Sequence, residues 1–524
     1  MPEYIKALIV VTAIALAVYS LAAPQLTEAI IAKGDYWRRA ALWLAVTATA
    51  FLAGNFWVFV AIAALLLIIG GLTDRNPMAF YAALLCAVPP LGSAISGLGV
   101  VNYFFELNYL RLLSLAVLLP AALRLFALRH QRVAGPKLPD ALLATYLVLL
   151  FVVTALALPF TTALRQGFYL FIDAWLVYYV ASRSVRDVIA FREVAAAFVL
   201  GATIMAVIAI FEASRGWLLY ATLESSLGVV WGYGHYMGRG LGGPLRAMAS
   251  TGHPIVMGYL MVVTIPLLMY LRPMIRSTFI WWLALAVLLG ALVVTLSRGP
   301  WVGGLAMALI AVGIGKGAAK RIGLLGAGVV AAAGLALQSD WGRGLLEYLP
   351  FIGTVGAETV EYRRRLFEVS MRVLAQSPFF GSPGFYSNSA AQELRQGEGI
   401  IDMVNSYLGI ALGSGAVGFT LFVGLFLSVI LLAWRAGTYA ATAPQVADIG
   451  RTLLAAVIGI LVIIGTTSNI NVIPSIYYLV IGWMAGCCGA FIAQGAPAET
   501  SPEAGPLDPL TMPVPVRSLR VSSR

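Results

Sequence analysis

Side chains suited to chemistry are confined to four short polar segments between long apolar runs. The first reads Pro244-Leu-Arg-Ala-Met-Ala-Ser-Thr-Gly-His-Pro and holds Arg246, Thr251 and His253. Pro254 fits the first turn of a helix, where its missing N–H is harmless, with Thr251 as a candidate cap. The free N–H groups and positive dipole end of such a helix suit phosphate. An ordinary helix start with an interfacial arginine explains the segment equally well.

The second segment, Leu296-Ser-Arg-Gly-Pro-Trp, joins two apolar runs through almost no loop. Arg298 is therefore held at the membrane boundary, where an arginine is costly and usually has a purpose. Its planar guanidinium pairs bidentately with phosphate oxygens. The alternative is an arginine that snorkels beside an anchoring Trp301.

The third segment lies in a long polar interruption, residues 338–403. Its part from Glu361 to Leu374 has apolar residues at helical spacing and predicts an amphipathic helix that ends at Ser377-Pro378. Arg363, Arg364 and Arg365 begin this helix. Such a cluster is either a solvated face or part of an anion site.

The fourth segment, Glu398-Gly-Ile-Ile-Asp-Met-Val-Asn-Ser-Tyr-Leu, leads back into an apolar run. Asp402, Asn405 and Tyr407 are polar groups at the mouth of that run. Asp402 is either the cap of the following helix or, within reach of arginines, a general base or a ligand for a sugar hydroxyl.

Several classes of site are excluded. The chain has no Walker loop, dinucleotide fingerprint, zinc-ligand pair or nucleophile elbow, and only three histidines. Its three cysteines fall in apolar runs without disulfide or metal spacing. We therefore expect chemistry by acids, bases and arginine charges, with no metal and no cofactor.

The elements that position these segments are predicted to be transmembrane helices. Of 524 residues, 60% are hydrophobic and 11% charged, with a mean hydropathy of +0.90, whereas about a quarter of a soluble domain is charged. Apolar runs of roughly 17–22 residues match the hydrocarbon core of a bilayer. The net charge of +11 is better explained by basic residues at the cytoplasmic side of the spans than by nucleic acid.

The fold class expected is an all-α polytopic membrane protein with about 14 spans and one large, partly helical loop. Five regions follow: N-terminal spans (1–199), spans that carry the arginine segments (200–337), the large loop (338–403), C-terminal spans (404–493), and a disordered cytoplasmic tail rich in Pro, Ala, Ser and Glu (494–524). Met78–Ile95 is one of the less regular predicted spans, since Pro89-Pro90 interrupts it.

Orientation follows from Lys and Arg in the short connections, which recur every two spans and mark the cytoplasmic side. The other face then holds residues 212–253, the turn at Ser297-Arg298-Gly299 and the large loop. All four polar segments therefore belong to one face.

The order and spacing of these segments resemble the O-antigen ligase/polymerase superfamily over roughly residues 200–470. The resemblance rests on an arginine before a His-Pro helix start, on Ser-Arg-Gly-x-Trp between spans, and on a loop that begins Arg-x3-Phe and runs to Pro-x2-Gly, followed by Asn-x-Tyr-Leu. It implies a GT-C-like glycosyltransferase of the bacterial inner membrane with its active site at the periplasmic face.

The resemblance further implies an undecaprenyl-pyrophosphate-linked oligosaccharide as donor, no metal, and inversion at the anomeric carbon. Arg246 and Arg298 are then catalytic, and Arg363, with Arg364 as the fallback, binds the pyrophosphate. His253, Asn405 and Tyr407 are the further substrate-binding candidates. The expected partners are the bilayer and a chain-length regulator.

One departure from the family pattern affects the reaction. The ligases have histidine where this chain has Val404, and valine takes no proton. Asp402 is the nearest replacement as base, with Glu398 and His253 as weaker alternatives, which favours a polysaccharide polymerase over a lipid A-core ligase. A glycolipid transporter, for which Asp173 is the clearest buried acid, and a non-catalytic scaffold remain the alternatives of other classes.

Overall fold

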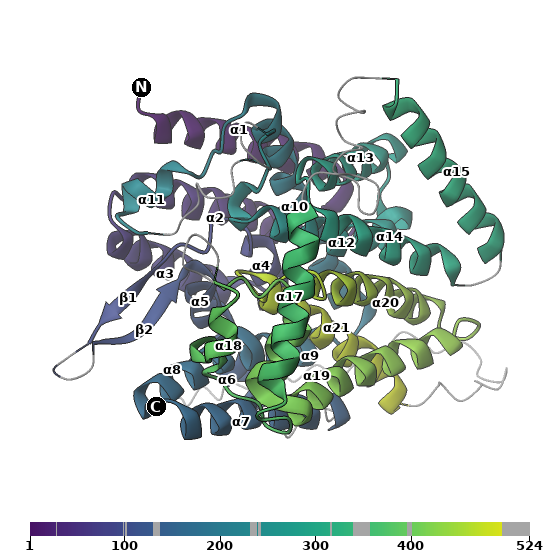
Figure 1. Cartoon of the computed structure of the whole chain (residues 1–524). Helices are drawn as coiled ribbons and strands as arrows, with labels where there is room; N and C mark the ends of the chain where they lie inside the picture. Colours follow the sequence, from purple (N-terminus) through teal and green to yellow (C-terminus); the bar gives the residue numbers. More distant parts are fainter. Residues whose placement is uncertain are drawn as a thin grey trace, which may run out of the picture.

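The protein is an assembly of closely packed helices with one small hairpin (Figure 1). The computed structural model describes residues 1–27, 29–97, 99, 102–128, 137–230, 238, 243–314, 317–338, 357–395 and 401–494.

The described residues up to Arg215 form ten α-helices and the two strands of the hairpin. Their bounds are α1 Glu3–Leu26, α2 Lys33–Leu52, α3 Phe56–Thr73, α4 Pro77–Leu84, β1 Gly92–Ser96, β2 Tyr103–Asn108, α5 Tyr109–Leu113, α6 Leu119–Ala127, α7 Lys137–Ala157, α8 Phe160–Leu170, α9 Val177–Ser184 and α10 Val188–Arg215. Two π-helical stretches, η1 Ser114–Leu118 and η3 Phe171–Leu176, join α5 to α6 and α8 to α9.

The described residues from Thr222 onward form ten further α-helices. Its bounds are α11 Thr222–Leu227, α12 Pro254–Leu271, α13 Thr278–Val294, α14 Arg298–Gly313, α15 Ala318–Ala336, α17 Ala357–Leu374, α18 Ser389–Gln392, α19 Ser406–Thr438, α20 Pro444–Ile464 and α21 Ile473–Gln494.

Nine helices in the described ranges are long and apolar enough to cross a membrane, and α13 and α14 are shorter apolar helices. The prediction of a polytopic, mainly helical membrane protein is therefore confirmed. The number of spans that meet this description is below the expected 14. Several predicted spans are short or charged: α2 opens with Lys33, Asp35 and two arginines, and α8 and α9 are separated by a π-helical stretch.

The predicted span Met78–Ile95 is wrong. The helix ends at Leu84 and the chain enters β1 after Pro89-Pro90, because proline supplies no backbone N–H and clashes with the preceding turn. β1 pairs antiparallel with β2, from Gly92 opposite Asn108 to Ser96 opposite Tyr103. The hairpin projects sideways from the bundle (Figure 1).

Burial separates inner from outer helices. In the most apolar stretch of α12, 89% of the residues are buried, and in α10 and α21 the share is 78%. In α1 and α7 only 22% of that stretch is buried. The inner helices therefore form the core, and the outer ones present side chains to the surrounding bilayer.

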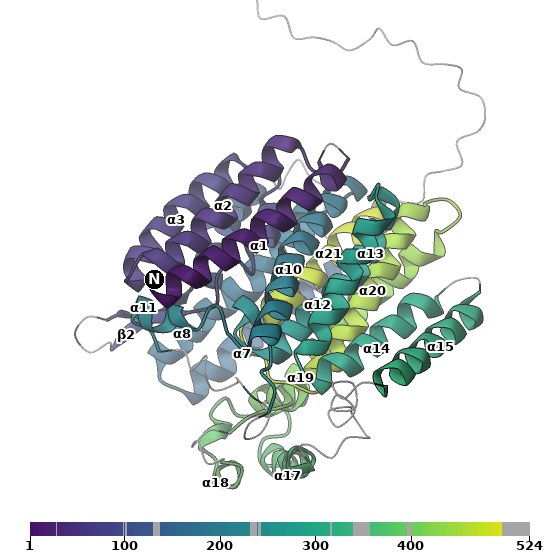
Figure 2. The same ribbon diagram turned by 90° about the horizontal axis from the view of Figure 1, so that it is seen from above.

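The large loop forms a separate layer at one end of the bundle, where α17 and α18 lie below the ends of the long helices (Figure 2). The helix predicted from Glu361 to Leu374 is confirmed as the greater part of α17. Its apolar face, Leu366, Val369 and Val373, packs on Phe385, on Leu394 and on Leu412 of α19. We call this end of the molecule the loop end.

A kink in α19 holds the loop in place. Gly415 has φ +64°, a conformation that side chains rarely adopt, and breaks the regular helix. The N–H groups of Ala416 and Val417 then donate to the carbonyls of Pro378 and Phe379, over 2.8 and 3.1 Å. The turn after α17 therefore satisfies backbone groups that the kink frees, as a membrane environment requires.

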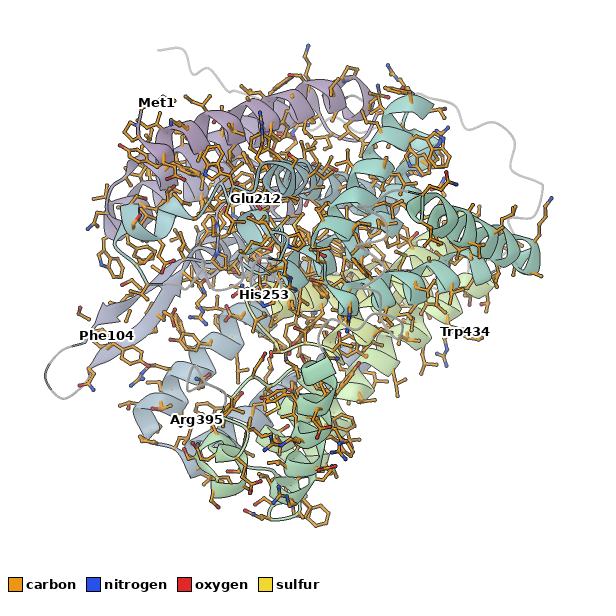
Figure 3. The ribbon with its side chains drawn as sticks, turned by 45° about the horizontal axis from the view of Figure 1, so that its top comes forward. Met1, Phe104, Glu212, His253, Arg395 and Trp434 are labelled. Carbon is orange, nitrogen blue, oxygen red and sulfur yellow. The ribbon has the colours of Figure 1, made fainter. Side chains whose placement is uncertain are left out.

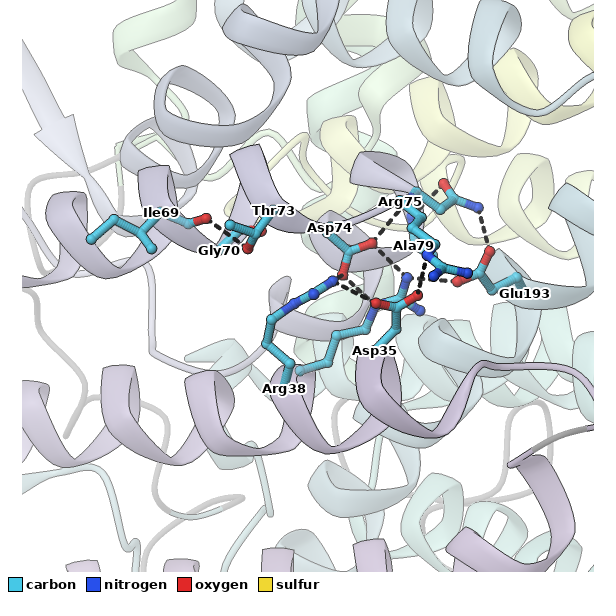
Figure 4. Close-up of polar contacts among 11 residues, drawn as sticks. Asp35, Arg38, Ile69, Gly70, Thr73, Asp74, Arg75, Ala79 and Glu193 are labelled. Carbon is cyan, nitrogen blue, oxygen red and sulfur yellow. Dashed lines mark hydrogen bonds and ion pairs between the residues drawn. The ribbon is translucent and has the colours of Figure 1, made fainter. Parts of the chain in front are cut away.

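The opposite end holds a buried ionic cluster (Figure 4). Arg39 donates to both carboxylate oxygens of Asp74, over 2.9 and 2.7 Å, and to Glu193 over 2.6 Å. The side chains of Arg39 and Asp74 are 3% and 0% exposed, so both charges depend on each other. Since α10 carries Glu193 near its start and Glu212 near its end, the cluster and the loop end lie about 28 Å apart along that helix.

Candidate functional site

The first two polar segments meet at the loop end. Nε of Arg246 donates to the carbonyl of Thr295 over 3.3 Å, and Nη2 donates to Oγ of Ser297 over 2.9 Å. The N–H of Ala247 donates to the carbonyl of Val294. Arg246 is thereby fixed beside the turn at Ser297. Arg298 follows this turn as the first residue of α14.

The loop helix brings the third segment to the same place. Nη2 of Arg363 donates to the carbonyl of Thr466 over 3.2 Å. The side chain of Thr466 lies against Gly299, so closely that a Cβ at Gly299 would collide with it. Thr466 therefore contacts both Arg363 and Gly299, the residue that follows Arg298.

The charges of neighbouring residues act on Arg363. Loss of surrounding water lowers the pKa of Arg363, and the positive charge of Arg298 lowers it further, while Asp402 opposes both effects. Arginine nevertheless stays protonated at any physiological pH. Two guanidinium groups that repel each other favour an anion between them.

The fourth segment contributes an acid to this group. Asp402 accepts a hydrogen bond from Oγ of Ser468 over 3.1 Å, and its carbonyl accepts one from the hydroxyl of Tyr362 over 2.9 Å. Removal of water by the surrounding protein raises the pKa of Asp402, with the Ser468 hydrogen bond and the charge of Arg363 acting in the other direction. A carboxylate with a raised pKa is a better base.

All four segments converge on a turn that sequence reasoning missed, Thr466-Thr-Ser-Asn-Ile-Asn471 between α20 and α21. Besides the contacts of Thr466 and Ser468, the carbonyl of Thr467 accepts from Ser406, and the side chain of Asn471 donates to the carbonyl of Thr251. We call residues 466–471 the hub turn. Its run of six residues with five polar side chains, between two apolar helices, was the available signal.

Backbone strain marks the same place. Among the described residues other than glycine, three have positive φ: Ala249, Leu296 and Asn471, at 46°, 48° and 50°. Each lies in one of the segments that build the site. Such conformations cost of order 1–3 kcal/mol and cluster at functional sites.

Glu212 anchors the backbone of the first polar segment. It lies near the end of α10, is fully buried, and accepts hydrogen bonds from the N–H groups of Leu219, Met248 and Ala249, over 3.1, 3.2 and 2.9 Å. It thereby holds the backbone that follows Arg246. Figure 3 shows Glu212 and His253 within the bundle, with Arg395 out on the loop layer.

His253 has a structural role that its sequence position did not reveal. It, and not Thr251, caps α12, since its Nδ1 accepts the N–H of Ile255 over 3.1 Å. Burial, together with the charge of Arg246, lowers the pKa of His253 to about 3. The imidazole is therefore neutral and a weak base, which disfavours it as the proton acceptor.

Three other predicted residues have structural partners. Asn405, and not Asp402, caps α19, because it accepts the N–H groups of Tyr407 and Leu408. The hydroxyl of Tyr407 donates to the carbonyl of Leu461 over 2.8 Å. Arg364 is 66% exposed and pairs with Glu361 over 2.7 Å, so it belongs to the solvated face of α17. Glu398 lies outside the described residues.

The site thus combines guanidinium groups, one carboxylate and hydroxyl donors at the end of a membrane bundle. In the described part of the chain, no three His, Cys, Asp or Glu side chains gather as a metal site would require. No protein-family model matches the chain, and no curated protein is significantly similar to it.

Proposed function

We propose that this protein is a GT-C-like membrane glycosyltransferase of the O-antigen polymerase/ligase type. It would transfer glycan from an undecaprenyl-pyrophosphate-linked donor to a sugar hydroxyl of a lipid-linked acceptor. The observation that carries the proposal is the meeting of Arg246, Arg298, Arg363 and Asp402 around the hub turn. These residues come from four segments spread over more than 150 positions of the chain.

The chemistry follows from the charges. The arginines bind the pyrophosphate of the donor and stabilise the negative charge that develops as it leaves. Asp402 takes the proton of the acceptor hydroxyl, whose oxygen bonds to the anomeric carbon while the carbon–oxygen bond to pyrophosphate breaks. Attack opposite the leaving group inverts the anomeric centre. The products are the elongated glycan and undecaprenyl pyrophosphate.

Membrane topology supports a site at the periplasmic face of a bacterial inner membrane. Basic connections between spans favour the cytoplasm for the opposite end, which leaves the loop end outside. Lipid-linked repeat units are displayed at that face, so the donor can enter from the bilayer.

Polymerase chemistry is favoured over transfer to lipid A-core by residue 404. Val404 packs against the apolar cluster under α17 and offers no proton acceptor. Asp402, two residues earlier, has a raised pKa beside Arg363. Asp402 lies two residues before the position of the ligase histidine, and a base at a different position fits an acceptor different from that of the ligases.

The transporter alternative loses support from Asp173. The side chain that suggested an isolated membrane acid forms an ion pair with Arg111 over 3.2 Å. A paired acid in this setting is a structural element as readily as an ion carrier.

The proposal is tested by incubating purified protein in proteoliposomes with undecaprenyl-pyrophosphate-linked repeat units. A ladder of elongated glycans, analysed by gel or mass spectrometry, is the expected result. Transfer to added lipid A-core would identify a ligase. Movement of the substrate across the bilayer without any new glycosidic bond would contradict the proposal in favour of transport.

The acid is tested by pH. Because Asp402 must be ionised to accept a proton, transfer should fall as the pH drops through its raised pKa and level off above it. Asp402→Asn should reduce the rate about 10²–10⁴-fold and remove that acidic limb. Glu393→Gln, on the exposed loop surface and paired with Arg372, is the matched control and should leave the profile unchanged. An unaltered acidic limb in Asp402→Asn would assign the base elsewhere.

A further inference from the structure

A second candidate binding site lies between the hairpin and two outer helices. A groove of about 890 Å³ runs between β2, α7, α8 and η3. Its walls are almost entirely apolar; Leu147, Phe151, Leu164, Phe168 and Trp175 are representative. Since α7 is a membrane-spanning helix with most of its surface outward, this groove opens where hydrocarbon chains surround the protein.

One positively charged side chain, that of Arg165, lines this groove. Arg165 stacks over the ring of Tyr103, 4.0 Å from the ring centre. Within the described residues no carboxylate lies within ion-pair distance of it, and the hairpin tip, residues 97–102, contains no acidic residue in the sequence. By contrast, nearby Arg111 is neutralised by Asp173 over 3.2 Å.

The position of Arg165 suits a lipid headgroup. It lies five residues after the start of α8, about 8 Å along the helix from the outer connection to α7. A long basic side chain at that depth extends toward the interface, where lipid phosphates lie. The apolar walls continue from there toward the middle of the bilayer.

We propose that this groove binds an anionic phospholipid, with one hydrocarbon chain along its apolar walls and the phosphate against Arg165. Any lipid tail can fill an apolar groove in a membrane, so the preference for an anionic headgroup comes from the charge of Arg165. The hairpin forms one wall of the groove, and its Phe104, which is 46% exposed, lies at the edge of the molecule (Figure 3).

The groove is distinct from the site at the hub turn. Helix α19 lies between them: its Phe422 contacts Tyr146 of α7 on one side, at 5.7 Å between ring centres, and its Tyr407 bonds to α20 on the other. The proposal therefore holds or fails independently of the glycosyltransferase proposal.

Lipid retention measures this site directly. Full-length protein in mild detergent is mixed with phosphatidylglycerol or with diacylglycerol of the same chains, and bound lipid is counted by native mass spectrometry. We expect phosphatidylglycerol to be retained at least about tenfold better, and Arg165→Ala to abolish that preference. Ala144→Trp, which fills the groove from α7, should reduce retention of both lipids.

The matched control uses another apolar groove. It lies between α1, α10, α12 and α13 and has no charged residue in its lining, so Leu283→Trp there should leave phosphatidylglycerol binding unchanged. Gel filtration confirms that each variant remains folded. Equal retention of the two lipids by the wild type, or unchanged retention in Arg165→Ala, would overturn the proposal. A third outcome is that Arg165→Ala loses phosphatidylglycerol, Ala144→Trp retains it, and inorganic phosphate competes with it. The site would then bind phosphate alone, which contradicts the placement of the hydrocarbon chain in the groove.

Discussion

Replacing Arg298 with alanine should reduce glycan transfer by about 10³-fold while the protein stays folded and inserted. A positioned arginine that stabilises departing phosphate charge contributes on the order of 10³–10⁵ in rate. Arg298 begins α14 next to Ser297, which Arg246 contacts, and its charge acts on Arg363. Its loss therefore removes charge from the centre of the proposed site. Ladder formation by the purified variant, measured as initial rate at saturating donor, gives the result.

The chain offers a matched control for this substitution. Arg364 neighbours Arg363 on α17, yet it is 66% exposed and pairs with Glu361. Arg364→Ala removes the same charge from the same end of the molecule and should change the rate less than about threefold. Comparable losses in both variants would mean that the loop end needs overall positive charge and that the geometry at Arg298 is unimportant.

Replacing Arg39 with methionine should destabilise the protein by about 3–5 kcal/mol. The substitution keeps an unbranched apolar side chain but removes the guanidinium. Asp74 then loses its bidentate partner and keeps only the contact with Arg38, and Glu193 loses its ion pair. Asp74 is fully buried, so water cannot replace the guanidinium. Unfolding in mixed micelles of increasing SDS fraction measures the change.

Arg75 provides the comparison for the ionic cluster. It lies at the rim, 83% exposed, with 4.0 Å to Asp35. Arg75→Met should cost no more than about 1 kcal/mol. If Arg39→Met is as mild as Arg75→Met, the buried cluster is not what joins α2, α3 and α10.

Local sequence patterns predicted the elements that carry their own signal. The spacing of Leu366, Val369 and Val373 predicts α17, because an amphipathic helix buries one face. Pro254 predicts the start of α12, since proline is tolerated in a first turn. The charged residues that mark the polar segments were found for a similar reason: in an apolar chain each one is conspicuous.

What the sequence did not reveal depends on contacts between distant segments. The hub turn has no charged residue, and its importance lies in carbonyls, such as that of Thr466, which every residue possesses. Asn405 and Tyr407 were predicted to bind substrate because polar groups are rare in this chain. In the structure Asn405 caps α19 and Tyr407 donates a hydrogen bond to a carbonyl of α20. The kink at Gly415 interrupts no apolar pattern, so only the docked turn from Pro378 explains it.

Binding of undecaprenyl pyrophosphate tests the central claim that Arg246, Arg298 and Arg363 form one pyrophosphate site. The wild type and Arg364→Ala should bind this lipid with similar affinity in nanodiscs, and Arg246→Ala, Arg298→Ala and Arg363→Ala should each bind at least about tenfold more weakly. Equal affinity across all five proteins would contradict the account.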